Sequence, residues 1–301
     1  MAIVSYFLWG FFPIYWRLLS DRFPIEILSH RLIWAGLFYS LLAFLVLKVK
    51  WSQILQSSKR EWMLSLGATL ILTLNWGLYI YAVNSGRIVE GSLAYFINPL
   101  MNVVVGVLLF DEKLSRSMRI AISLAAVGVI AKLFVVGEPP YLALTLATSF
   151  CIYGILKKKS RIPASQSSFQ EGAIGAVLGF LILGVFSNVK HVEPIPYSTF
   201  FLFVGSGVVT GLPLYLFSYA AQRVPYSLMG LFQFIAPSLQ LMVGVLIFKE
   251  PFPLAQQITF GFIWVGVIFY CVDRVNTWNK ARLEQRRLAQ GLMPEKFADP
   301  A

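Results

Sequence analysis

Residues 96–112, FINPLMNVVVGVLLFDE, recur 138 positions later as residues 234–250, FIAPSLQLMVGVLIFKE. Without a gap, the same shift aligns residues 81–130 with residues 219–268, and 17 of these 50 pairs are identical. Shared apolar composition accounts for some of the matches, but it does not keep a proline, a glycine and a closing glutamate in register over such a length. The sequence therefore predicts an internal repeat, and this self-similarity decides the architecture.

The chain around the repeat is too apolar to be solvated by water alone. Of its 301 residues 57% are hydrophobic and 13% are charged, and the mean hydropathy is +0.71. A soluble chain has roughly 45–50% apolar and 25% charged residues, and a helix needs about 20 apolar residues to cross a membrane. Ten runs approach that length and predict an all-α integral membrane protein with ten transmembrane helices: 2–19, 27–47, 62–83, 92–110, 119–136, 140–156, 168–186, 198–221, 227–248 and 256–272.

Lysine and arginine are distributed unequally between the two sets of connecting loops. Eighteen lie in one set, which includes the C-terminal tail, and four lie in the other. Because basic residues are retained on the cytoplasmic side, we expect both termini to be cytoplasmic. The net charge of +11 is explained by these topology signals, so we expect membrane lipid as a partner and no nucleic acid. The first run lacks a basic leader and a small-residue cleavage site, and is expected to be a retained helix.

Five helices in each copy of the repeat is an odd number, so the two copies are expected to have opposite orientations in the membrane. The predicted organisation is a first repeat over residues 1–136, a second repeat over residues 137–272, and a basic cytoplasmic tail over residues 273–301. Inverted repeats that enclose a site near the middle of the membrane are typical of secondary transporters.

Four segments carry a resemblance to a known family. They are PIYW at residues 13–16, EILSHR at 26–31, NWGLYI at 75–80 and SLAYFINPL at 92–100. Together they resemble the RarD-like permeases of the EamA family, in the drug/metabolite transporter superfamily, over about residues 1–272. The resemblance implies ten helices in two EamA repeats, a location in the bacterial inner membrane and permease activity.

Polar side chains at membrane depth point to a binding cavity. Tyr95, Asn98 and Asn102 share one helix face, and the shift of 138 places Gln233 and Gln240 at the positions of Tyr95 and Asn102. We expect these side chains to face a central cavity, and the alternative is hydrogen bonding between helices. The full set of candidates for the substrate cavity is Trp9, Asn75, Tyr79, Tyr95, Asn98, Asn102, Tyr215, Tyr219, Gln233 and Gln240.

Five further residues are candidates for movement or charge. Pro99 and Pro237 each remove a backbone hydrogen bond, so they are gating candidates, with packing-driven kinks as the alternative. Arg31 is expected near the outer end of its helix, either snorkelling, paired with Glu26 or attracting an anionic substrate. Glu112 and Glu250 end repeat-equivalent helices, as interfacial charges or as groups of a gate.

The hypothesis for function is a secondary transporter, a permease that moves a small metabolite or drug-like solute by alternating access. The sequence has no P-loop, no G-x-S-x-G, no H-E-x-x-H and no metal-ligand spacing, so we expect no enzyme activity, no cofactor and no metal. The alternatives are a membrane-embedded enzyme or lipid-handling protein that uses the same cavity, and a channel. Gly175-x-x-x-Gly179 and Gly207-x-x-x-Gly211 predict close helix packing.

The loop charges make a prediction about topology. In a cysteine-free background, single cysteines at Ser57 and Ser165 should react with membrane-impermeant reagents only from the cytoplasmic side. A cysteine at Glu193 should react only from the outside. Labelling of all three positions from one side would contradict the ten-helix topology.

Overall fold

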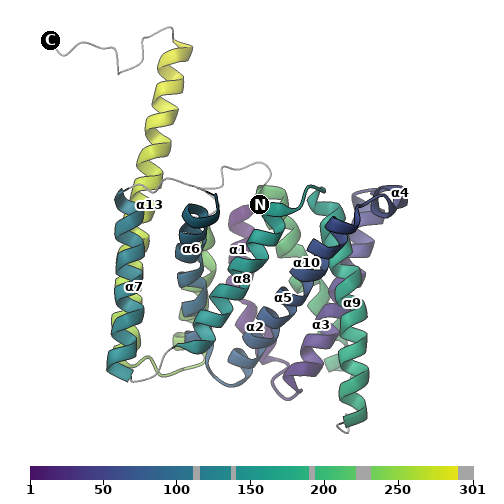
Figure 1. The fold of residues 1–301 in the computed structure, drawn as a ribbon. Helices are drawn as coiled ribbons and strands as arrows, with labels where there is room; N and C mark the ends of the chain where they lie inside the picture. Colours follow the sequence, from purple (N-terminus) through teal and green to yellow (C-terminus); the bar gives the residue numbers. More distant parts are fainter. Residues whose placement is uncertain (111–115, 137–139, 190–193, 222–231, 291–301) are drawn as a thin grey trace, which may run out of the picture. The chain divides into compact units, whose positions relative to one another are not determined.

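The computed structural model describes residues 1–110, 116–136, 140–189, 194–221 and 232–290. All regular structure in these ranges is helical (Figure 1). The predicted all-α class is therefore confirmed for the described residues, and every predicted apolar run contains a helix. The helices are α1 (Ala2–Gly10), α2 (Phe12–Arg17), α3 (Pro24–Leu41), η1 (Leu42–Val46), α4 (Trp51–Leu55), α5 (Lys59–Asn84), α6 (Ile88–Phe110), α7 (Arg116–Val136), α8 (Tyr141–Lys159), α9 (Ala164–Val189), α10 (Tyr197–Ala221), α12 (Ile235–Met242), η2 (Val243–Ile247) and α13 (Leu254–Ala289).

Five helical stretches in the described part of the chain are long and apolar enough to cross a membrane. At a rise of 1.5 Å per residue, a stretch of about 20 residues spans a hydrocarbon layer of ~30 Å, and these stretches have between 21 and 33 residues. Shorter apolar helices occur at residues 119–128, 141–157 and 235–247. The five long stretches are Pro24–Val46, Lys59–Asn84, Ala164–Asn188, Tyr197–Phe217 and Gln257–Ala289.

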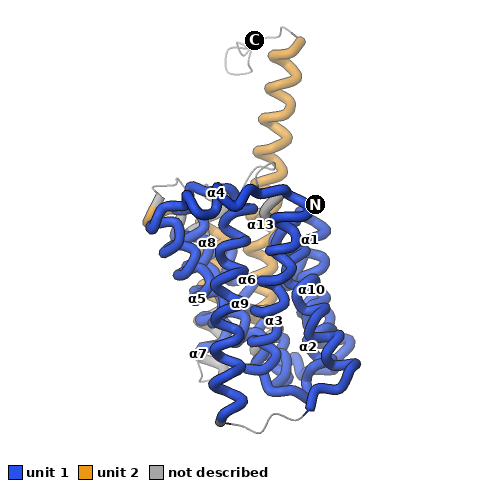
Figure 2. The backbone as a smooth tube through the Cα atoms, turned by 90° about the vertical axis from the view of Figure 1, so that its right-hand side faces the viewer, with its two compact units in different colours: residues 1–105, 139–253 blue, residues 106–138, 254–301 orange. Residues whose placement is uncertain are grey.

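The chain forms two compact units, shown in different colours in Figure 2. Unit 1 comprises residues 1–105 and 139–253, and unit 2 comprises residues 106–138 and 254–301. In unit 1, α3 packs against α5, α9 and α10, while α5 also packs against α8 and α9. The α1 helix packs against α10 and α12. This arrangement makes α3 the central helix of unit 1.

Glycines allow α3 to approach its neighbours closely. A Cβ atom at Gly36 would lie 2.5 Å from the carbonyl oxygen of Gly172 on α9, and one at Gly179 would lie 2.7 Å from the carbonyl oxygen of Ser29. On α10, a side chain at Gly207 would collide with the backbone of Trp34. The close packing predicted for the spaced glycines is therefore confirmed at Gly179 and Gly207, where only a hydrogen fits.

The first apolar run is divided into two short helices. Phe11 has a non-helical ψ of 1° between α1 and α2, and Pro13 occupies the first turn of α2. Proline is tolerated there because the first-turn N–H groups have no partner within a helix. Side chains then attach both pieces to α10: Ser5 Oγ donates to the carbonyl of Pro213 at 2.7 Å, and Tyr15 donates to the carbonyl of Leu202.

Unit 2 is built on the pairing of α7 with α13. A Cβ atom at Gly128 would lie 3.0 Å from the carbonyl of Thr259, and one at Gly266 would lie 2.9 Å from the carbonyl of Ala121. The α13 helix continues to Ala289, well past the end of the apolar run. The first part of the predicted basic tail is therefore a helical extension with exposed side chains, whereas residues 291–301 lie outside the described part.

The glycine contacts of α9 allow a matched test of helix packing. Gly179→Ala inserts a methyl group beside a backbone carbonyl of α3 and should destabilise the protein by roughly 1–3 kcal/mol. Gly184→Ala lies on the same helix, where nothing is within 4 Å of the added atom, and should change stability by about 0.5 kcal/mol or less. Thermal unfolding in detergent measures both, and equal Tm values for the two variants would contradict the packing argument.

Candidate functional site

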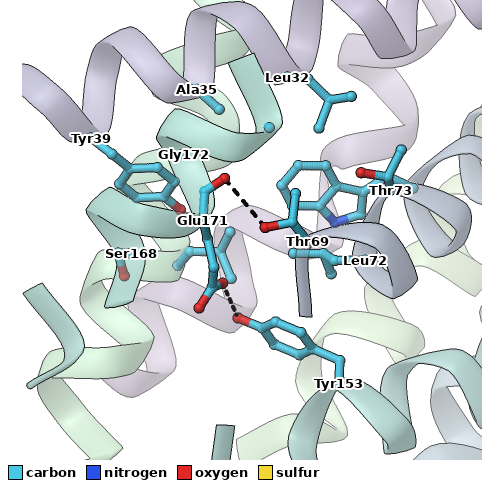
Figure 3. A pocket seen from close by; sticks show the side chains of 13 residues that line it. Leu32, Ala35, Tyr39, Thr69, Leu72, Thr73, Tyr153, Ser168, Glu171 and Gly172 are labelled. Carbon is cyan, nitrogen blue, oxygen red and sulfur yellow. Dashed lines mark hydrogen bonds between the residues drawn. The ribbon is translucent and has the colours of Figure 1, made fainter. Parts of the chain in front are cut away.

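A small cavity lies inside unit 1, lined by residues of α3, α5, α8, α9 and α10 (Figure 3). Its volume is about 30 Å³, and a water molecule needs at least roughly 10–15 Å³. The cavity therefore admits about two water molecules and no organic solute. Leu32, Ala35, Leu72 and Leu214 contribute apolar surface, and the polar and aromatic groups that line the cavity are Tyr39, Thr69, Thr73, Trp76, Tyr153, Ser168 and Glu171.

An ion pair within α8 and α9 occupies one side of this cavity. Lys157 Nζ lies 2.5 Å from Glu171 Oε1 and donates to Ser167 Oγ at 2.6 Å, and Tyr153 donates to Glu171 Oε2 at 3.3 Å. The Glu171 side chain is only 11% exposed. The pair is partly buried, so removing one partner leaves the other charge incompletely compensated. This pair therefore holds α8 and α9 together in the arrangement seen here.

The sequence-based site prediction missed Glu171 and Lys157. Lys157 begins a basic stretch that indicates a loop, but in the structure it belongs to the last turn of α8. Glu171 lies seven residues into α9, about 10 Å from its start. The signal that was available is that Glu171 is the only charged residue in the predicted run 168–186.

Arg31 is buried inside unit 1 and does not pair with Glu26. It lies seven residues into α3, about 10 Å from the helix start, and only 2% of it is exposed. Its Nε donates to Thr210 Oγ1 on α10 at 2.9 Å. Glu26 pairs with Arg22 instead, at 2.6 and 3.0 Å. Arg31 thus points into unit 1, although a charge at the centre of a bilayer costs ~2.5–3.5 kcal/mol on insertion scales.

Three aromatic rings surround the Arg31 guanidinium. Its carbon lies 4.0 Å from the ring centroid of Trp76, 4.7 Å from that of Trp16 and 5.8 Å from that of Phe12. Cation–π contacts reach about 2 kcal/mol or more when they are desolvated, so these rings offset part of the cost of burial. Trp76 also lines the cavity, which brings the guanidinium to the wall of the candidate site.

Most of the predicted cavity amides form hydrogen bonds between helices. Asn75 donates to Leu146 O and to Ser149 Oγ, both at 2.9 Å. Asn98 donates to Ala147 O at 3.0 Å and accepts from Gln233 at 2.9 Å, and Gln240 donates to Trp9 O at 3.0 Å. The structure therefore brings Asn98 and Gln233 together, and the role of these groups toward a solute stays a prediction.

The aromatic candidates fall into two groups. Tyr79 is buried and packs edge-to-face with Tyr95 at 5.7 Å, while its hydroxyl has no partner. Trp9 packs with Tyr6 and Phe217 in a separate apolar cluster, and Tyr215 is half-buried on α10. The side chains of Asn102 and Tyr219 lie outside the described part.

Repeat-equivalent residues meet in unit 1. Phe96 of α6 stacks on Phe234, the residue 138 positions later, with 6.5 Å between ring centroids and 25° between ring planes. Pro99 lies inside α6 and is buried, whereas Pro237 is the third residue of α12. The chain already turns at Phe234, so Pro237 starts a helix and does not interrupt one.

Glu250 caps α6 at its N-terminus. The turn after η2 places Lys249 at a φ of 55° and is closed by the Glu250 N–H, which donates to Gly244 O at 3.0 Å. The Glu250 carboxylate accepts from the backbone N–H groups of Ile88 and Val89 at 3.0 and 2.8 Å. A carboxylate favours this position because the first N–H groups of a helix have no partner in the helix.

Arg17 reinforces the same end of the bundle. Its guanidinium donates to Val83 O at 3.2 Å and lies 5.6 Å from the ring centroid of Phe248. Together the contacts of Arg17 and Glu250 join α2, α5, α6 and the segment after η2. The repeat-equivalent Glu112 lies outside the described residues.

No group of three or more His, Cys, Asp or Glu side chains that could hold a metal occurs within the described ranges. The cavity offers phenols, hydroxyls, one indole and an already paired carboxylate.

Five helical stretches in the described residues have the length and apolar composition of membrane spans. The EamA-like transporter family matches residues 1–134 and 140–272, so the chain belongs to this family. The predicted resemblance is thereby confirmed.

Relatives of similar length agree with this assignment. The uncharacterized transporter YojE of Bacillus subtilis is 38% identical over 92% of this chain and 94% of its own. Protein RarD of Streptomyces exfoliatus is 33% identical over 99% and 95%, and protein RarD of Escherichia coli is 35% identical over 92% and 94%. A solved crystal structure at 20% identity covers 90% of this chain and 96% of that chain with a TM-score of 0.64, which shows a shared fold.

The Glu250 cap predicts a pH dependence of stability. Partial burial raises the pKa of Glu250 above its ordinary 4.5, although the two backbone donors and Arg17 act against this shift. A raised pKa means that the folded state binds the proton more tightly than the unfolded state, so the contribution of Glu250 is greatest at low pH. The contribution of Glu250 to stability decreases as the pH rises from the ordinary pKa of 4.5 through the raised pKa of the folded state.

The measurement is Tm against pH for the wild type and Glu250→Gln. The Tm of the wild type should exceed that of Glu250→Gln by a smaller amount as the pH rises. Glu90→Gln, on the same helix but in an exposed pair with Arg87, should keep a small and constant difference because exposed pairs contribute little. An advantage that widens with pH would show that the backbone donors and Arg17 outweigh burial.

Proposed function

We propose that this chain is a secondary transporter of the bacterial inner membrane that moves a small solute by alternating access, with both termini in the cytoplasm. The observation that carries the proposal is the small cavity among apolar helices in unit 1, which combines apolar surface with a few hydroxyl groups and the Glu171 carboxylate. Pockets for small organic ligands occupy roughly 300–1,000 Å³, whereas this one has about 30 Å³. A solute can occupy it only if the surrounding helices move apart.

The repeat supports two inverted five-helix halves, over residues 1–136 and 137–272. Phe96 and Phe234 are equivalent in the two copies and stack on each other, which is expected where a pseudo-twofold axis passes between them. Asn98 and Gln233 are hydrogen-bonded beside this contact. Pro99 removes a backbone hydrogen bond inside α6, and Pro237 lies in the first turn of α12. Each follows the Phe96–Phe234 contact by three residues, and they are the gating residues of this proposal.

Two polar groups would control the two ends of the pathway. The Lys157–Glu171 pair joins α8 to α9 on one side of the cavity, and the Glu250 cap joins the segment after η2 to α6. Alternating access requires that such contacts form and break in turn, because opening both ends together would make a channel. In this proposal the Lys157–Glu171 pair is the gate of the α8–α9 side.

Transport into proteoliposomes tests the function directly. Purified protein is reconstituted and supplied with a radiolabelled extract of bacterial metabolites, and the accumulated compounds are identified. Saturable accumulation of a specific solute is expected. Chemical conversion of the solute would support the membrane-embedded enzyme, and uptake without saturation would support the channel.

The gate makes a specific prediction. Glu171→Gln removes the charge but keeps a similar shape, so it should lower the transport rate about tenfold or more, since a hydrogen bond to a charged group contributes roughly 1.5–3 kcal/mol. Glu90→Gln removes a carboxylate of the same 11% exposure, whose partner Arg87 is 47% exposed and which does not line the cavity, and should transport at the wild-type rate. Equal rates in both variants, at equal amounts of inserted protein, would exclude the gate.

A further inference from the structure

Arg31 has a fixed positive charge inside unit 1 and no acidic partner among the described residues. The ion pairs of the described residues join other side chains, and the two nearest in sequence, Arg22 and Glu26, pair with each other. The Nε of Arg31 has one neutral partner, Thr210, and its Nη1 is buried without any. The guanidinium stays charged although Arg31 is only 2% exposed. It therefore lacks a counter-anion among the described residues.

The aromatic rings around Arg31 do not supply the hydrogen-bond acceptor that its Nη1 atom lacks. The Trp76 centroid lies 4.0 Å from the guanidinium carbon, which is a stacking distance. Stacking uses the faces of the guanidinium, whereas the N–H bonds lie along its edges, in the plane in which a carboxylate or phosphate binds. The rings of Phe12, Trp16 and Trp76 form an aromatic cage that holds the guanidinium in place. The cage leaves one edge of the guanidinium open for an oxyanion.

Other buried donors near the cage also lack acceptors. Trp16 Nε1, the hydroxyl of Thr73 and the hydroxyl of Tyr79 have no hydrogen-bond partner. An indole N–H only donates, and Trp16 itself touches the guanidinium. The Tyr79 and Tyr95 hydroxyls lie near enough to interact electrostatically with Arg31. Unpaired donors of this kind fit a ligand rich in acceptor oxygens.

The cage adjoins the cavity. Trp76 and Thr73 line the cavity, and Trp76 carries the guanidinium on its ring. A solute that enters an opened cavity beside Trp76 therefore comes next to the unpaired edge of Arg31. On the other side of the cavity, Lys157 already neutralises Glu171, so Arg31 is the unpaired charge of the site among the described residues.

We propose that Arg31 binds an oxyanion group of the transported solute, a carboxylate or a phosphate, and that Trp16, Thr73 and Tyr79 supply further donors. The inference rests on the proposed transport function and names its substrate class: a small organic molecule that carries such a group. Arg31 is then a binding residue, and the aromatic cage positions it.

Binding is tested on purified protein without knowledge of the natural solute. The probes are acetate, benzoate and glycinate, each compared with its primary amide, which has nearly the same shape without the negative charge. Inorganic phosphate is the second arm, and sodium chloride at the same ionic strength is the reference. At least one carboxylate or phosphate should raise Tm above the reference, and the amides should not.

Variants then assign the effect to Arg31. Arg31→Met should weaken binding of the stabilising anion about 10- to 100-fold, as expected for loss of charged hydrogen bonds. Arg22→Lys changes another buried arginine, whose partner is Glu26. It should lower the basal Tm and keep the anion-dependent shift. If Arg31→Met does not fold, Thr210→Val removes only the hydroxyl that orients Nε and should weaken binding several-fold.

Each outcome bears on the proposal. A shift with carboxylates or with phosphate supports it and tells the two groups apart. Equal effects of acids, amides and chloride, or an anion shift that Arg31→Met retains, would overturn it. In proteoliposomes, accumulation of solutes that carry no oxyanion would overturn this inference and leave the transport function intact. Anion binding through Arg31 without any transport would overturn the transport function and leave the anion site at Arg31 intact.

Discussion

The constraint on which this structure depends is the absence of water in the interior of a membrane. Every polar group that the helices carry into that layer needs a partner within the protein. Asn75, Asn98 and the Gln240 amide nitrogen meet this requirement by donating to backbone carbonyls of neighbouring helices, whereas Gln240 Oε1 is buried without a partner. Ser5 does the same at the carbonyl of Pro213. Such bonds are possible only because the helices lie close together.

The same constraint identifies the groups that the fold does not satisfy. Arg31 Nη1 and the hydroxyls of Thr73 and Tyr79 are buried without hydrogen bonds. Burying these polar groups without hydrogen bonds has a cost that packing does not recover. Thr73 lines the small cavity, and Trp76, which also lines it, stacks on the Arg31 guanidinium. A solute that satisfies them would stabilise an open arrangement of the same helices.

Charged contacts at two places suggest how movement is limited to a few states. The Lys157–Glu171 pair links α8 and α9, and the Glu250 carboxylate holds the first N–H groups of α6. Each contact is local and polar, so it is either formed or broken, whereas the glycine-packed face between α3 and its neighbours resists gradual deformation. Rigid helices joined by a few breakable polar contacts form a suitable framework for alternating access.

The sequence by itself determined the class of the protein. Apolar runs of membrane-spanning length predicted the helices, the register of residues 96–112 with 234–250 predicted the repeat, and short motifs indicated the EamA family. These features are readable because lipid imposes length and hydropathy on each segment separately, without reference to the rest of the fold. The close packing at Gly179 and Gly207 was predictable for the same reason, since a small residue in each helical turn has one main use in a membrane.

Only the tertiary structure decided which side chains act together. Sequence spacing placed Tyr95, Asn98 and Asn102 on one face, but it did not show that Asn98 bonds to Gln233 and to α8. It placed Arg31 near the surface beside Glu26, whereas Glu26 is taken by Arg22, and Arg31 turns inward to Thr210 and Trp76. The physical reason is that a side chain's partner depends on the rotation and crossing of whole helices. Those are fixed by contacts between residues far apart in the chain, which no local pattern contains.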